Sequence, residues 1–138
     1  MKLSACIFAV LALLCLPRTT SSEDPELGFL SAQLPMYPPL ARTAHVVGEV
    51  KMAFVIDPSG SVISVEILSG NSMLRKEAEK NVRTWKFQKS VEPSQGQRKD
   101  RTTFVYKLNA NEPETLAVRM RSYRYVEVEA SLVPQVNY

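Results

Sequence analysis

Residues 49–67 read EVKMAFVIDPSGSVISVEI, and this stretch decides the fold. Every second position of its first half is apolar: Val50, Met52, Phe54 and Ile56. Such alternation predicts a strand with one buried face, because successive side chains of a strand point to opposite sides. Residues 57–60 have the order of a type I turn, Asp-Pro-Ser-Gly, and alternation resumes over residues 63–67. We therefore expect an antiparallel hairpin.

An amphipathic helix of roughly fourteen residues is expected after this hairpin. Asn71 and Ser72 follow Gly70 and supply the break and the N-cap. Apolar residues then recur at spacings of four, four and three: Leu74, Ala78, Val82 and Trp85. A large aromatic at the apolar period of a helix is normally a core residue. We therefore interpret Trp85 as part of the core and not as a stacking platform for a ligand.

The opposite face of this helix is basic. It carries Arg75, Lys76, Glu79, Lys80, Arg83 and Lys86. The surrounding segment, residues 71–107, holds ten Lys or Arg against four Asp or Glu. The face is either a solvated surface, which is usual for charged helix faces, or a docking surface for a partner.

A third strand is predicted further along the chain. Over residues 102–108 two sets of side chains alternate, Phe104, Tyr106 and Leu108 against Thr103, Val105 and Lys107. Upstream of the first hairpin, Pro39 favours one or two helical turns over residues 40–44. The expected fold is therefore α+β. It has a β-β-α-β nucleus, with an antiparallel sheet of three or more strands and one main helix packed on one face.

Weaker alternation beyond Asn109 adds a C-terminal hairpin to this expectation. In the first segment Val118 and Met120 alternate with Arg119 and Arg121, and in the second Val126 and Val128 alternate with Glu127 and Glu129. The two segments would join near Ser122 and Tyr123. Their arginines and glutamates could then face each other, which contributes about 0.2–1 kcal/mol per cross-strand pair.

Residues 1–22 are expected to be a signal peptide, because a positive start is followed by an apolar run over residues 3–16 and a polar stretch. The run is shorter than the about 20 apolar residues of a membrane-spanning helix. We therefore predict removal of the leader and a location in the periplasm or cell envelope. The alternative is a retained leader that anchors the protein in the inner membrane, which is its only expected membrane contact. Residues 23–33 are then a linker, residues 34–110 one domain and residues 111–138 a C-terminal extension.

Composition argues against several functional classes. Both cysteines, Cys6 and Cys15, lie in the predicted leader, so the exported chain would hold no thiol. His45 is the single histidine and cannot build a zinc site alone. Asp57 occupies the first position of a turn, and this structural role explains it better than a role as a catalytic acid. Removal of the leader lowers the number of basic residues from 17 to 15, against 14 acidic residues. The resulting net charge is close to zero and does not support nucleic-acid binding. We predict no enzyme, no catalytic residues, no metal and no cofactor.

Several motifs together resemble the C-terminal domain of the TonB family in order and spacing. They are Tyr37-Pro38-Pro39-Leu40-Ala41-Arg42, Gly48-Glu49-Val50, Asp57-Pro58-Ser59-Gly60, Ile67-Leu68-Ser69-Gly70 and Trp85-Lys86-Phe87. The resemblance runs from about Leu34 to Leu108. It implies a bacterial protein-binding module of the periplasm. Such a module adds an extended segment of an outer-membrane transporter, or of another envelope protein, to its sheet as a further strand.

The resemblance also implies which residues bind the partner. The docking edge would be the last strand of the nucleus, Thr102, Thr103, Phe104, Val105, Tyr106, Lys107 and Leu108. Tyr37 and Pro38 would lie in the transporter-contacting region, although from the residues alone they are either a packing corner or a partner contact.

The segment between the predicted leader and the domain bears on energy transduction. The family's energy transducer has a membrane anchor and a long proline-rich spacer, whereas residues 17–34 are 18 residues that reach at most about 65 Å. We therefore expect a binding module, and energy transduction stays an open question at this point. The alternative function is a structural or self-association domain of the envelope, whose edges pair with a second copy, as in a homodimer, or with its own tail.

Overall fold

The computed structural model describes residues 27–92, 94, 96–111 and 116–133. The predicted signal peptide, residues 1–22, lies outside them, as do parts of the predicted linker and C-terminal extension. The elements are β1 (Phe29–Ser31), α1 (Pro39–Thr43), β2 (Gly48–Ile56), β3 (Val62–Ser69), α2 (Ser72–Val82), β4 (Lys86–Phe87), β5 (Arg98–Asn109), β6 (Leu116–Ser122) and β7 (Tyr125–Ser131).

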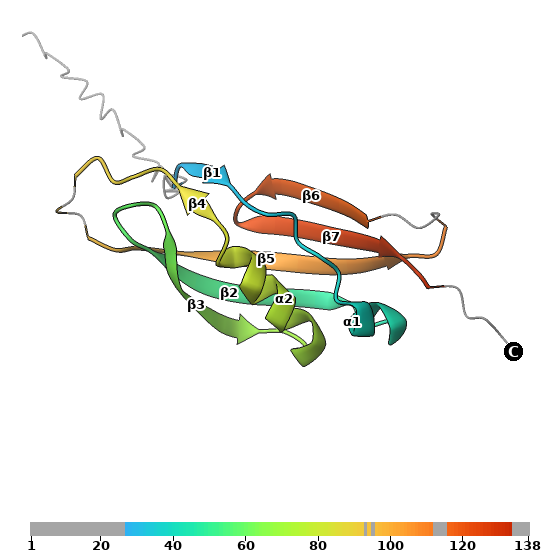
Figure 1. Cartoon of the computed structure of the whole chain (residues 1–138). Coiled ribbons are helices and arrows are strands. Elements are labelled where there is room, and N and C mark those ends of the chain that lie inside the picture. Colours follow the sequence, from blue (N-terminus) through green and yellow to red (C-terminus); the bar gives the residue numbers. More distant parts are fainter. Residues whose placement is uncertain (1–26, 93, 95, 112–115, 134–138) are drawn as a thin grey trace, which may run out of the picture.

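Five strands form the main sheet in the order β3-β2-β5-β7-β6 (Figure 1). β2 pairs antiparallel with both β3 and β5. β6 and β7 form an antiparallel hairpin, and β7 lies parallel to β5. A separate two-stranded sheet joins β1 to β4. The main sheet is therefore mixed, with β3 and β6 at its two edges.

The β2–β3 turn depends on Asp57 and Gly60. The amide of Gly60 donates to the carbonyl oxygen of Asp57 at 3.0 Å, and Asp57 Oδ1 accepts from Ser59 Oγ at 2.6 Å and Ser61 N at 3.0 Å. The hydrogen bonds from Ser59 and Ser61 lower the pKa of Asp57. Gly60 has a φ of +91°, and a Cβ there would overlap the carbonyl oxygen of Phe87. Only glycine fits this position without strain.

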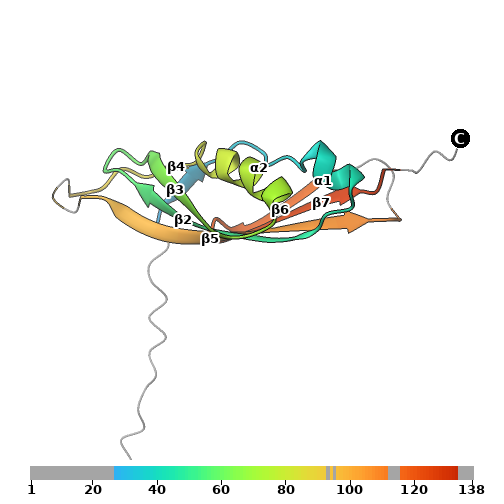
Figure 2. The same ribbon diagram turned by 90° about the horizontal axis from the view of Figure 1, so that it is seen from below.

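Both helices cover one face of the sheet (Figure 2). α2 begins after Asn71, whose side chain accepts a hydrogen bond from the amide of Met73 at 2.8 Å, as the predicted N-cap requires. The helix has 11 residues and ends at Val82, so it is shorter than the predicted fourteen. The reason is that the chain tightens after Val82: the amide of Trp85 bonds to the carbonyl oxygen of Val82 at 3.1 Å, three residues back.

Trp85 lies at the centre of the core between α2 and the sheet, as the sequence predicts, and is fully buried. Its ring stacks on Phe104 at 5.9 Å and stands edge-on to Phe54 at 5.6 Å. Its Nε1 donates to Asn81 Oδ1 at 3.0 Å, so the polar atom of the indole is satisfied.

The predicted α+β fold, with one main helix on one face of the sheet and a C-terminal hairpin, is confirmed. Two details differ. Structure was expected to begin near Leu34, but β1 begins at Phe29, because its ring packs edge-on against Trp85 and Phe87 at 5.6 and 5.5 Å. The hairpin also inserts β7 beside β5 in a parallel direction. Alternation in sequence does not report the neighbour or the direction of a strand.

Candidate partner-binding edges

Tyr37 and Pro38, predicted as partner contacts, form a packing corner ahead of α1. Tyr37 is only 5% exposed, its hydroxyl donates to the carbonyl oxygen of Val46 at 2.5 Å, and its ring stands edge-on to Tyr106 at 5.3 Å. Burial raises the pKa of Tyr37 to about 12, so the hydroxyl keeps its proton at neutral pH. Pro38 is also buried. The pair offers a partner little surface in this structure, and its contact with a partner stays a prediction.

β5, predicted to supply the docking edge at Thr102–Leu108, lies inside the sheet. On one side it pairs with β2 over Arg98–Tyr106, and on the other with β7 over Thr103–Asn109. Strand addition needs an edge with free main-chain donors and acceptors. An incoming strand therefore reaches these residues only if β7 leaves.

The start of β7 is fixed to β5 through Asp100. Tyr123 donates its hydroxyl to Asp100 Oδ2 at 2.5 Å, and Arg124 donates Nε and Nη2 to the same oxygen at 3.1 and 2.9 Å. Thr102 Oγ1 donates to the carbonyl oxygen of Tyr123 at 2.7 Å. Burial raises the pKa of the Asp100 carboxyl, but hydrogen bonds from Tyr123 and Arg124 lower it by more, so the pKa lies below its usual value. Asp100 is a carboxylate at neutral pH.

The end of β7 is fixed to α1. Arg42 donates Nε to the carbonyl oxygen of Ser131 and Nη2 to its hydroxyl, both at 2.7 Å. Between the two ends, Val126, Val128 and Ala130 are buried in the core. β7 thus belongs to the folded domain along its whole length.

Charged pairs cover the helix-free face of the hairpin. Arg119 lies 3.2 Å from Glu127 and 3.0 Å from Glu129, and Lys107 lies 3.0 Å from Glu127. The predicted facing of arginines and glutamates is confirmed for Arg119. The hydrogen bond from Lys107 is the largest cause of the lowered pKa of Glu127.

Among the described strands, β3 and β6 each keep one side unpaired in the main sheet. β3 exposes Ile63 and Leu68 by 45% each and carries one charged residue, Glu66. β6 exposes Leu116 and Met120 by 48% and 38%. These two strands are the open edges of the domain.

Sequence reasoning missed β6 as an edge. The available signal was Arg119 and Arg121, because basic residues are common on edge strands, where they hinder uncontrolled pairing. The pattern was interpreted only as one half of a hairpin. Its position at the border of the sheet depends on the insertion of β7 beside β5.

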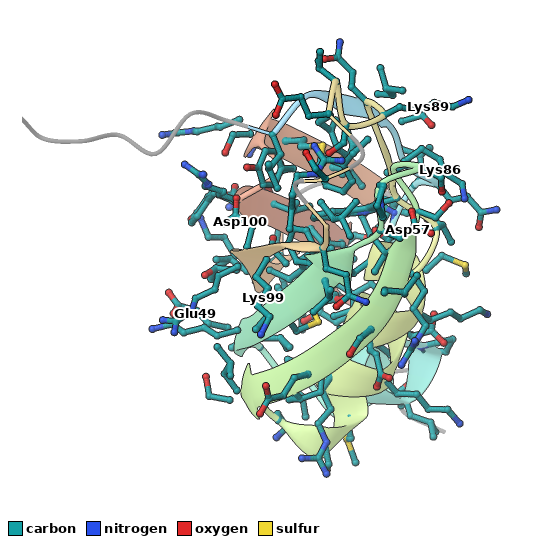
Figure 3. The ribbon with its side chains drawn as sticks, turned by 90° about the vertical axis from the view of Figure 1, so that its left-hand side faces the viewer. Glu49, Asp57, Lys86, Lys89, Lys99 and Asp100 are labelled. Atoms are coloured by element: carbon teal, nitrogen blue, oxygen red, sulfur yellow. The ribbon has the colours of Figure 1, made fainter. Side chains whose placement is uncertain are left out.

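The predicted basic surface is divided between two parts of the molecule. Arg75, Lys76 and Lys80 are exposed on α2 and face solvent. Lys86 and Lys89, on β4 and just after it, lie at the end of the molecule shown in Figure 3, on the opposite side of that view from Asp100. In this structure the basic face of α2 is solvated.

The described residues hold no cluster of three His, Cys, Asp or Glu side chains that could bind a metal ion. His45 is exposed in the link between α1 and β2, and its φ is +54°. In the described part of the chain no helix has the length and apolar character to span a membrane.

Comparison with known proteins identifies the family. Residues 33–108 match the family described as the Gram-negative bacterial TonB protein C-terminal. The chain belongs to the TonB C-terminal family. Protein TonB of Escherichia coli (strain K12) is 32% identical over 74 residues, which are 52% of this chain and 30% of that protein. The solution NMR structure of the Pseudomonas aeruginosa TonB CTD covers 61% of this chain and 88% of its own, with 24% identity and a TM-score of 0.48.

Family membership confirms the predicted resemblance. TonB-like domains are protein-interaction modules of the bacterial envelope and are not enzymes, as the sequence predicts for this chain. The chain spans less than a third of the length of the Escherichia coli relative.

Proposed function

We propose that this protein is an exported, periplasmic TonB-like module that captures an extended segment of an outer-membrane transporter, or of another envelope protein, by strand addition. Family membership supports a protein-interaction role. The observation that carries the mode of binding is the pair of open sheet edges at β3 and β6. Main-chain groups at such an edge bind an extended peptide with little dependence on its side chains.

The contacts of β7 with Asp100, α1 and the core oppose its displacement from β5. Asp100 holds its start, Arg42 holds its end and its core-facing side chains are buried. The residues Thr102–Leu108 would therefore act in the binding of a partner from within the sheet, by positioning the hairpin that carries the open edge β6.

The second candidate function is self-association in the envelope. It is favoured by β3, whose edge exposes Ile63 and Leu68 beside a single charge, Glu66. Uncharged apolar edges pair readily with a second copy of the same strand. The two functions differ in oligomeric state and in response to peptides.

The test is peptide binding to the protein expressed from its full sequence. Extended TonB-box-like peptides are titrated by calorimetry, and matched peptides with central prolines serve as controls because proline removes main-chain donors. Amide hydrogen exchange should slow along one sheet edge only. A dimeric protein that ignores every peptide would exclude capture. Mass spectrometry of the N-terminus in envelope extracts tests the proposed removal of the leader.

A further inference from the structure

Three cavities border the inner side of β6, one after another along the strand. The first has about 390 Å³ beside Leu116 and Met36, the second about 230 Å³ beside Val118 and Leu34, and the third about 380 Å³ beside Ser122. The other wall of the first two cavities includes the extended chain between β1 and α1, which crosses the hairpin on the helix side of the sheet (Figure 1), and that of the third is Leu27–Phe29 at the start of β1. The open edge of β6 therefore runs beside a furrow.

The furrow is lined by apolar side chains that lack cover. Leu34 and Met36 on the crossing segment are 78% and 60% exposed, and Leu116 and Met120 on β6 are exposed opposite them. Exposed apolar groups in one row are unusual on a small monomeric domain and mark binding surfaces. A strand added to β6 would direct every second side chain into this furrow.

The two arginines of β6 differ in their surroundings. Arg119 points to the side opposite the furrow, since it alternates with Val118 and Met120, whereas Arg121 lies at a register shift of the strand and lines the third cavity. Arg119 pairs with Glu127 and Glu129, whereas Arg121 is exposed and forms no ion pair within the described part of the chain. An added strand would place a side chain beside Arg121, where an acidic residue forms a favourable charge pair and a basic residue an unfavourable one.

From these observations we infer that β6 is the docking edge, and that its occupant is an extended partner segment whose apolar side chains enter the furrow and which carries an acidic residue beside Arg121. The inference rests on the proposed function and specifies its site and its partner chemistry. A second copy of β6 is a poor occupant. Two paired copies would place four arginines along their interface, and neither strand supplies an acidic residue to balance them.

The test compares peptides that differ only in charge. An eight-residue peptide that alternates valine and glutamate, and the same peptide with lysine for glutamate, are titrated into the protein expressed from residues 1–138. We expect the glutamate peptide to bind at least roughly fivefold more tightly, and to protect amides of β6 from hydrogen exchange. Equal binding of both peptides would refute the charge assignment.

Matched variants locate the edge. Met120→Glu on β6 is compared with Leu68→Glu on β3, because each introduces a carboxylate at a partly exposed edge position. Arg121→Glu is compared with Lys76→Glu on the solvated face of α2, which makes the same change of charge. The β6 variants should weaken binding of the glutamate peptide by roughly fivefold or more, and the controls should leave it within about twofold.

The outcomes separate this inference from the proposed function. If only Leu68→Glu weakens binding, capture by strand addition stands and the assignment to β6 fails. If neither valine peptide binds the wild-type protein but TonB-box-like peptides do, capture stands and this inference fails, whereas if none of these peptides binds, the proposed function itself fails. If sedimentation shows a dimer that Arg121→Glu dissociates or strengthens, the occupant of β6 is a second copy and the inference is overturned. Arg121→Glu keeps the test decisive should Met120→Glu not fold, because its side chain is exposed.

Discussion

Asp100→Asn should release the start of β7 from β5. Asp100 Oδ2 accepts three hydrogen bonds, one from Tyr123 and two from Arg124, and the carboxylate forms an ion pair with Arg124 at 2.9 Å. Asparagine keeps the shape but removes the negative charge and turns one oxygen into a donor. In either orientation of the amide that donor would face another donor, the guanidinium of Arg124 or the main-chain amide of Arg101.

The expected loss follows from the exposure of the pair. The side chains of Asp100 and Arg124 are 16% and 33% exposed, so water replaces their contact only in part. Hydrogen bonds to charged groups contribute about 1.5–3 kcal/mol each, and the variant weakens several of them without removing all. We expect the free energy of unfolding to fall by about 2–3 kcal/mol, which lowers Tm by roughly 10 °C or more in a domain of this size.

The measurement is urea unfolding followed by tryptophan fluorescence, since Trp85 lies in the core beside Tyr123. Glu49→Gln is the matched control. Its ion pair with Lys51 spans 3.9 Å, and both side chains are more than half exposed, so we expect a change within about 0.5 kcal/mol. A loss below about 0.5 kcal/mol for Asp100→Asn would refute the claim that Asp100 holds the hairpin.

The same variant should respond differently to acid. Because the folded-state pKa of Asp100 is lowered, its contribution is present above the unfolded-state pKa, near about 4, and is lost as pH falls through the folded-state pKa. The difference between wild type and Asp100→Asn should therefore be constant near neutral pH and shrink below about pH 4. A difference that persists at the lowest pH of folded protein would contradict this cause.

Three further predictions concern other parts of the fold. Gly60→Ala should lower the free energy of unfolding by more than about 1 kcal/mol, because its Cβ meets the carbonyl oxygen of Phe87 at a φ of +91°, and thermal unfolding measures the loss. Arg42→Ala removes both hydrogen bonds to Ser131, so hydrogen exchange at the end of β7 should accelerate before exchange at its start. Trp85→Phe should cost about 1–3 kcal/mol through the cavity and the lost indole hydrogen bond, and unchanged stability by calorimetry would argue against its central place in the core.

Much of the fold could be predicted because it depends on local patterns. The β2–β3 hairpin follows from alternation and a turn whose Asp57 and Gly60 satisfy fixed geometric needs, and the burial of Trp85 follows from its helical period. The ends of elements were less predictable, since α2 stops at Val82 although the apolar period continues to Trp85. There the tertiary core, and not the helix, holds the aromatic side chain.

The candidate site was harder to predict because it depends on which strands become neighbours. Thr102–Leu108 were correctly recognised as a strand, but no property of those residues reports that β7 would occupy their free side. The decisive contacts join residues far apart in sequence, such as Arg42 to Ser131 and Asp100 to Tyr123. Alternation of apolar residues predicts a strand but does not predict such long-range contacts.

The free-energy cost of removing β7 from β5 explains why an edge that is already open is the better docking site. Removing β7 would break its pairing with Thr103–Asn109 and expose Val126 and Val128, together with Tyr123 at its start. Full burial contributes about 1.5–3 kcal/mol for each large apolar side chain, so exposure costs on the order of 5 kcal/mol, comparable to the whole stability of a small domain. Each 1.4 kcal/mol is about a tenfold change in affinity, so a peptide competing for β5 would bind more than roughly a thousandfold more weakly than at an edge already free. A partner that adds to β6 avoids this loss and keeps the hairpin as part of its binding surface.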